Sequence, residues 1–134
     1  MSQPDSGLRK RNGEEPAAVR REASWQEVKR CVQPLLENFQ LPKFAQNAKY
    51  DLTVLKRHGV AVAGIAFDTM IASYLLTPET RHNLERLAQV YLEHKVITFA
   101  EVVGTGKKQR NFSEIELETA RDYSCEDADV TLRL

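Results

Sequence analysis

Two short apolar runs, each followed directly by a helix-start signal, limit this chain to a fold that mixes strands with helices. Residues 43–46 (KFAQ) are short enough for a strand, and Asn47 after them can cap a helix over about 48–57. Residues 60–67 (VAVAGIAF) predict a second, buried strand, and Asp68 after them is expected to be the N-cap of the next helix. In α/β proteins, polar active groups gather at such strand-to-helix junctions.

Three further helices are predicted around these junctions. Ser24 and Glu27 form an S-x-x-E capping box at the start of the first one. Apolar residues at helical spacing predict another helix over about 82–92. The last helix is expected from about residue 116 to the end of the sequence.

The chain of 134 residues is long enough for one compact domain. Residues 1–23 are polar with mixed charge and are expected to be a disordered or non-homologous leader ahead of a domain over 24–134. Cys31 and Cys125 lie far apart, which argues against a zinc ribbon or a disulfide scaffold and fits a reducing cytoplasm.

The overall charge and hydropathy exclude some partners. No apolar run reaches the roughly 20 residues that a membrane helix needs, so no membrane partner is expected. The formal net charge is zero, which by itself does not indicate a nucleic-acid partner but leaves room for a local basic strip.

An acidic residue lies on the apolar stripe of the last predicted helix. The stripe follows the positions i, i+4, i+7 and i+11, which are Tyr123, Asp127, Val130 and Leu134. Glu126 and Asp129 point elsewhere and are expected to be solvated. An unpaired buried carboxylate is costly, so Asp127 needs a cation, a metal or hydrogen bonds. Tyr123 lies one turn earlier, with its hydroxyl on the same side.

A second acid, Asp51, lies at the upstream strand-to-helix junction, in the segment NAKYD. Two acids from separate elements can hold a divalent cation through oxygen ligands. Two such cations can activate water for phosphodiester hydrolysis, with Tyr123 positioning that water. The alternative is that Asp51 is only a cap or a partner of the helix dipole, and the residue pattern alone leaves both interpretations open.

Five segments together resemble the 3′-5′ proofreading exonuclease domain of bacterial DNA polymerase I, a family A polymerase. They occur in that family's order and at its spacing, from about Gln26 to Leu134, and this is more specific than a single short motif. The segments are QNAKYD at 46–51, GIAFDTM with SYLL at 64–76, H-x-L-x-x-LA at 82–88, HKVITFAEVVGTGKKQ at 94–109 and YSCEDADVTLRL at 123–134.

The resemblance implies an α/β fold of the RNase H-like (DnaQ-like) type that removes 3′-terminal nucleotides of DNA with two divalent ions, Mg²⁺ or Mn²⁺. By the same resemblance, Asp51 and Asp127 would hold metal and Tyr123 would orient the attacking water. The single-stranded 3′ end of DNA would be contacted by Asn47, Tyr50, Arg81, Lys107 and Lys108. The family further implies a bacterial cytoplasmic, nucleoid-associated location and a polymerase domain as partner in replication and repair.

One departure from the family weakens the implied activity. The family's first motif, Asp-x-Glu on its first strand, is absent from the sequence, and residues 1–23 do not resemble the expected strands. We therefore expect a fold truncated at the front, mostly helical, with about two short strands. The site would lack two carboxylates, so the isolated chain is expected to be weakly active or inactive.

Two alternatives stay open at this point. The missing carboxylates can come from elsewhere, such as a second chain, or the chain can be a non-catalytic remnant that binds single-stranded nucleic acid or another partner. Likewise, Lys107 and Lys108 belong to a basic loop that either contacts phosphate or is simply solvated.

Overall fold

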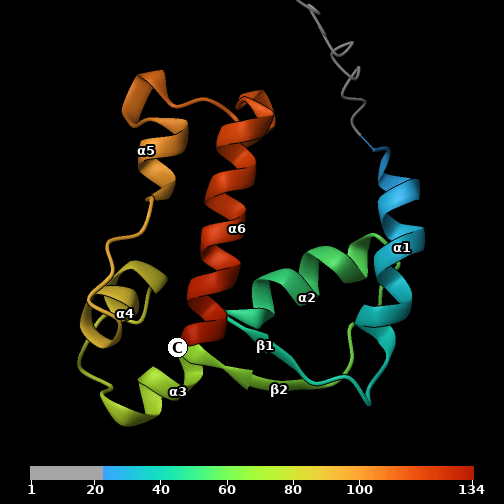
Figure 1. The fold of residues 1–134 in the computed structure, drawn as a ribbon, viewed down its shortest axis with the longest axis horizontal. Helices are drawn as coiled ribbons and strands as arrows, with labels where there is room; N and C mark the ends of the chain where they lie inside the picture. The colour runs from blue at the N-terminus through green and yellow to red at the C-terminus, as the bar shows by residue number, and fades with distance from the viewer. Residues whose placement is uncertain (1–22) are drawn as a thin grey trace, which may run out of the picture.

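A computed structural model describes residues 23–134 (Figure 1). The predicted leader therefore lies, apart from Ala23, outside the described residues. The described part is mostly helical, as expected, with one small sheet. Its elements are α1 (Trp25–Glu37), β1 (Lys43–Ala45), α2 (Ala48–Arg57), β2 (Ile65–Asp68), α3 (Thr69–Leu76), α4 (Leu84–Tyr91), α5 (Phe99–Val103), the 3₁₀ turns Gly106–Lys108 and Phe112–Glu114, and α6 (Leu117–Arg133).

The sheet consists of β1 and β2, which run parallel and are joined through α2. A parallel pair needs such a crossover, and the helix between the strands provides it. The last residue of β1, Ala45, pairs with the last residue of β2, Asp68. Both strands therefore end at one place, and α2 and α3 both begin there (Figure 1).

The second predicted strand is shorter and more exposed than its apolar sequence indicates. Residues 60–64 form no strand, and β2 begins only after Gly64, which has φ 74°. A Cβ on Gly64 would lie 2.8 Å from the carbonyl oxygens of Phe39 and Leu41, so this turn requires glycine. Ile65 and Phe67 are exposed, and the prediction of a buried strand is wrong because no second layer within residues 23–134 covers these side chains.

The first helix begins with the predicted capping box, in which Ser24 and Glu27 each accept the other's backbone N–H. Pro34 lies inside the helix, which ends three residues later at Glu37. No residue of α1 is buried, and polar bonds connect the helix to the residues that end and follow α2. Among these bonds, the Lys29 ammonium donates to the His58 carbonyl oxygen at 2.9 Å.

The main hydrophobic core lies between α4 and α6. Val130 of α6 and Ala88 of α4 are fully buried there, together with Val96 from the segment between α4 and α5. The predicted stripe of the last helix thus packs inward at Val130. This contact attaches α6, the central helix in Figure 1, to α4.

Hydrogen bonds to Glu126 also hold α6 in place, although Glu126 was expected to be solvated. Glu126 is half-buried and accepts hydrogen bonds from His94 Nε2 at 2.9 Å and from the Ile97 backbone N–H at 2.6 Å. The prediction that Glu126 is solvated is wrong, because the chain after α4 folds back against this side of α6. Asp129 is exposed, as predicted. No helix in residues 23–134 is long and apolar enough to cross a membrane.

Val130→Ala should destabilise the protein by about 2 kcal/mol, since it removes fully buried methyl groups from the core that positions α6. Urea unfolding of the purified chain measures the change in the free energy of unfolding. Leu132→Ala is the matched control, because Leu132 is on the same helix but 71% exposed. Equal losses for the two variants would show that α6 is not held by this core.

Candidate active site

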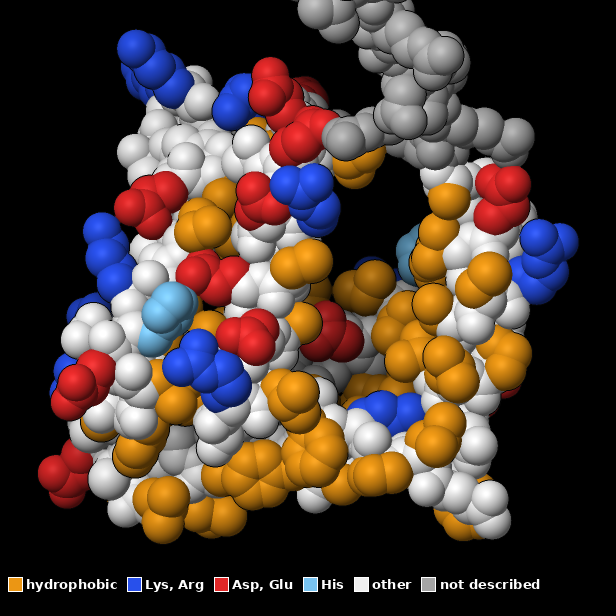
Figure 2. Space-filling model, viewed as in Figure 1, with side chains coloured by type: hydrophobic (Ala, Val, Ile, Leu, Met, Phe, Trp, Pro, Cys, Tyr) orange, Lys and Arg blue, Asp and Glu red, His pale blue; other side chains and the backbone are white. Residues whose placement is uncertain are grey.

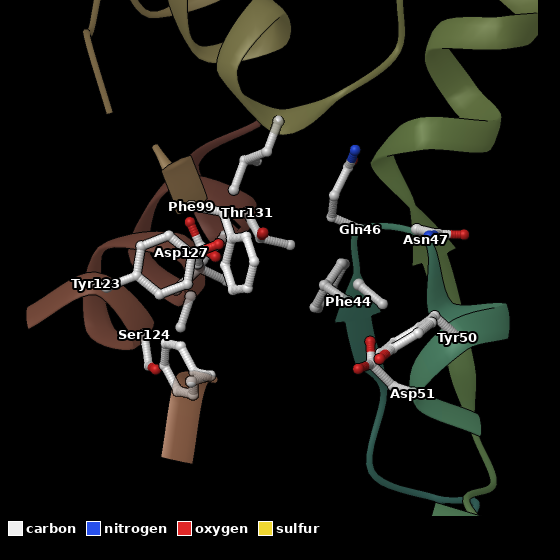
Figure 3. A pocket seen from close by; sticks show the side chains of 15 residues that line it. Phe44, Gln46, Asn47, Tyr50, Asp51, Phe99, Tyr123, Ser124, Asp127 and Thr131 are labelled. Atoms are coloured by element: carbon white, nitrogen blue, oxygen red, sulfur yellow. The ribbon is translucent and has the colours of Figure 1, made fainter. Parts of the chain in front are cut away.

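A cleft of about 1050 Å³ separates α6 from the end of β1 and the first turn of α2. Figure 2 shows the corresponding hollow between the two sides of the molecule, and Figure 3 shows the side chains around it. The cleft is lined by Phe44, Ala45, Gln46, Asn47, Tyr50, Asp51, Leu84, Phe99, Phe112, Tyr123, Ser124, Asp127, Ala128, Thr131 and Leu132. Five of the predicted site residues are among these.

One wall of the cleft belongs to α6 and carries Tyr123 and Asp127 one turn apart. Each side chain affects the pKa of the other through hydrogen bonding between the Tyr123 hydroxyl and the Asp127 carboxylate. Two aromatic rings brace the tyrosine, since the centroids of Phe99 and Phe112 lie 6.2 and 6.0 Å from that of Tyr123. The helical spacing that paired Tyr123 with Asp127 is therefore confirmed, and both face the cleft.

The opposite wall is the junction between β1 and α2, which carries Asn47, Tyr50 and Asp51 (Figure 3). Asn47 occupies the N-cap position with a left-handed backbone, φ 60° and ψ 46°, but its side chain makes no capping hydrogen bond. The expected capping by Asn47 is therefore wrong. Asp68 acts in its place, because its carboxylate accepts from the backbone N–H groups of Asn47 and Ala48.

The surroundings of Asp127 and Tyr123 disfavour added negative charge. Burial raises the pKa of Asp127, with further contributions from the nearby carboxylates of Glu126 and Glu85, whereas the hydrogen bond from Tyr123 opposes the rise. Burial, together with the charge and hydrogen bond of Asp127, raises the pKa of Tyr123 to about 12. The tyrosine thus keeps its proton throughout the physiological range.

Asp51 has a raised pKa for related reasons. Partial burial is the largest cause, although the residue as a whole is exposed, and the negative charge of Asp68 adds to it. Within residues 23–134, neither Asp51 nor Asp127 forms a salt bridge with a lysine, arginine or histidine. A cation bound in the cleft would lower the pKa of both carboxyl groups, because it favours their charged forms.

The donor set for such a cation is only partial. Asp51 and Asp127 face one another from opposite walls, and carboxylate oxygens suit Mg²⁺ and Mn²⁺. However, the described residues contain no group of three or more acidic, histidine or cysteine side chains arranged to hold a metal. These two residues therefore fit part of a metal site.

The remaining predicted site residues lie outside the cleft lining. Arg81 is exposed in the turn before α4, and Lys107 and Lys108 are exposed in the first 3₁₀ turn. The structure thus brings Asn47, Tyr50, Asp51, Tyr123 and Asp127 together and leaves these three basic residues apart from them.

Some lining residues were not anticipated from the sequence. Thr131 stands at i+4 from Asp127, so helical spacing could have identified it. Phe99 and Phe112 reach the cleft through long-range packing, and no local pattern marks them. Gln46 accepts from the Thr69 hydroxyl and donates to the His82 carbonyl oxygen at 2.8 Å, which joins the end of β1 to α3 and the following turn.

The profile of the 3′-5′ exonuclease family of family A DNA polymerases matches residues 10–134. The chain belongs to this family. The match begins upstream of Ser24, where the exonuclease domain is predicted to start. The RNase H-like fold expected of such exonucleases fits the described helices and the parallel strand pair.

Several curated relatives are bacterial DNA polymerase I proteins. The chain is 46% identical over 110 residues to that of Pseudomonas aeruginosa, which covers 80% of the chain and 12% of the relative. It is 43% identical over 110 residues to that of Chloroflexus aurantiacus, covering 81% and 12%. It is 35% identical over 126 residues to that of Treponema pallidum, covering 92% and 12%. The chain thus spans about an eighth of the length of these relatives.

Asp127→Asn should stabilise the exonuclease chain at neutral pH. The pKa of Asp127 is higher in the folded than in the unfolded state, so the folded state is favoured by protonation. That contribution is present below the ordinary aspartate pKa and is lost as the pH rises through the raised value. The neutral amide avoids this loss, and the expected gain at pH 7 is a few tenths to about 1 kcal/mol.

Urea unfolding at pH 7 and at pH 3.5, without divalent ions, measures this difference. The gain should shrink at the lower pH, where the wild-type carboxyl is also neutral. Asp129→Asn is the control, because Asp129 is exposed on the same helix and pairs with Arg133 at 3.4 Å. A variant at Asp127 that is less stable than the wild type at pH 7 would contradict the expectation.

Proposed function

We propose that this chain binds the single-stranded 3′ end of DNA in the cleft between α6 and α2 and supplies Asp51 and Asp127 to a site for Mg²⁺ or Mn²⁺. The observation that carries the proposal is the pair of carboxylates with raised pKa that face one cleft without a cationic partner in the described residues. Family membership supports DNA as the substrate class.

The metal would be held by carboxylate oxygens of Asp127 on α6 and Asp51 on α2. A bound divalent ion supplies Lewis-acid polarisation of the phosphate and lowers the pKa of water. The two residues would compensate part of the ion's charge, and the ion would favour their charged forms against the burial that now raises the pKa of each. Ion binding and full ionisation of these carboxylates should therefore reinforce each other.

Tyr123 would orient the attacking water. Its hydroxyl would donate its hydrogen to Asp127, so the lone pairs of the hydroxyl oxygen would remain available to accept a hydrogen bond from water. Because its pKa is about 12, the hydroxyl stays neutral in this role. Phe99 and Phe112 fix the ring and so fix the position of that oxygen.

The DNA strand would enter along the α2 side of the cleft. Tyr50 lines the cleft and is 67% exposed as a residue, and an accessible tyrosine ring can stack on a base without sequence preference. Asn47 lies beside it. Arg81, Lys107 and Lys108 are exposed outside the cleft lining, where they would contact phosphates of the strand by electrostatic attraction.

The chain by itself is expected to cleave DNA weakly or not at all. Its sequence has no Asp-x-Glu motif, and its described residues bring no third acidic ligand to the cleft. This observation favours a second candidate function for the isolated chain, which is metal-assisted binding of single-stranded DNA without hydrolysis. In a longer protein, a polymerase domain would be the natural partner, and the bacterial cytoplasm near the nucleoid the expected location.

Binding of a fluorescent single-stranded oligonucleotide should be strengthened by Mn²⁺ and weakened about tenfold by Asp127→Asn or by Asp51→Asn. Fluorescence anisotropy with increasing Mn²⁺ measures the affinities. Asp129→Asn should leave them unchanged, because that carboxylate is exposed outside the cleft lining.

A parallel assay uses DNA labelled at its 5′ end with Mg²⁺ or Mn²⁺. Little or no shortening is expected. A ladder that shortens from the 3′ end and disappears in Asp127→Asn would instead show that this chain completes the catalytic site by itself. Affinities that do not respond to Mn²⁺, or that are equal in all variants, would refute the shared metal site.

A further inference from the structure

The carboxylate of Asp68 joins the beginnings of two helices. It is the last residue of β2, is only 9% exposed, and accepts hydrogen bonds from four backbone N–H groups. Its Oδ1 accepts from Met70 and Ile71 of α3 at 2.9 and 3.3 Å and also from Asn47 at 3.2 Å. Its Oδ2 accepts from Ala48 of α2 at 2.7 Å.

This arrangement explains how the buried carboxylate of Asp68 is tolerated without a cationic partner among the residues that the structure describes. Each helix start presents unpaired N–H groups and the positive end of its dipole, and here two starts converge on one carboxylate. Hydrogen bonds from N–H to an ionised carboxylate are stronger than neutral ones. Both oxygens are used, so little of the desolvation cost of Asp68 remains uncompensated.

The two carboxylate oxygens of Asp68 have different partners, so capping α3 and holding α2 can be told apart. Oδ1 caps α3, as an N-cap aspartate ordinarily does, and also accepts from the Asn47 N–H just before α2. Oδ2 makes no bond within α3 and serves only the Ala48 N–H, at the first residue of α2. A residue that capped α3 alone would need a single acceptor, so the second oxygen holds α2.

The first turn of α2 depends on this contact because its own N-cap does not provide one. Asn47 is in the left-handed region, which carries a conformational cost, and its side chain makes no capping bond. The same turn carries Tyr50 and Asp51 into the cleft. The contact from β2 therefore sets the direction from which Asp51 faces α6.

We propose that Asp68 is a positioning residue for the candidate active site, acting through the N-terminus of α2 to place Asp51 in the cleft. The inference rests on the proposed function of that cleft. Asp68 does not line the cleft itself, so it has no direct contact with substrate or metal in this role.

Asp68→Ser separates the two roles. A serine hydroxyl can still cap α3 through Met70 and Ile71, but it is too short to reach α2 as well. Asp68→Asn is the isosteric comparison: its amide oxygen can cap α3, whereas its NH₂ group would face the Ala48 N–H, donor against donor. Thr53→Ser on the far part of α2 is a control for general perturbation, since either hydroxyl can bond to the Lys49 carbonyl oxygen.

The first readout is amide hydrogen exchange of the full chain, followed by NMR. In Asp68→Ser, protection of the Ala48 amide should fall at least about tenfold, while that of Met70 and Ile71 should change less than about threefold. Equal protection of the Ala48 amide in the wild type and both variants would overturn the proposal, because Oδ2 of Asp68 would then not stabilise the first turn of α2.

The second readout is a double-mutant cycle on Mn²⁺-dependent oligonucleotide binding. Asp68→Ser should weaken binding about tenfold in the wild type and have little effect in the Asp51→Asn background, because the two changes remove the same contribution. Equal factors in both backgrounds would indicate a general structural role and would overturn the positioning role alone. Absence of Mn²⁺-dependent binding by the wild type would instead refute the proposed function together with this role.

Discussion

The parallel pairing of β1 with β2 is the constraint on which the site depends. Because Ala45 and Asp68 pair at the ends of their strands, α2 and α3 start side by side, and one carboxylate can serve both helices. A slip of the pairing by one residue would turn Asp68 to the other face of the sheet and break this connection. The α2 wall of the cleft is therefore a consequence of strand register more than of any preference of α2 itself.

The opposite wall has an independent support. Helix α6 is held by apolar packing at Val130 and by the two hydrogen bonds that Glu126 accepts. Its other face bears Asp127 among groups that disfavour its charge. A rigid attachment on one side thus permits an unfavourable electrostatic arrangement on the other, which is the usual trade between stability and a binding site.

Local signals in the sequence were sufficient for most helix starts, for the first strand and for the end of the second. The capping box at Ser24, the N-cap at Asp68 and the pairing of Tyr123 with Asp127 follow from spacing along a single element. The exposure of β2, the partners of Glu126 and the aromatic support from Phe99 did not follow, because each depends on which distant segment packs nearby. The second duty of Asp68 was hidden for the same reason, since its additional partners lie about twenty residues away in the sequence.

The two walls of the cleft come from segments far apart in the sequence, residues 43–57 and 117–133. Contacts between such distant segments close a long loop and form slowly compared with local helices. The strand–helix unit that bears Asp51 can form early in folding, but the cleft lacks its opposite wall until α6 has packed into place. During synthesis, the cleft can therefore form only after α6 has been made, and DNA could not engage both of its walls before then.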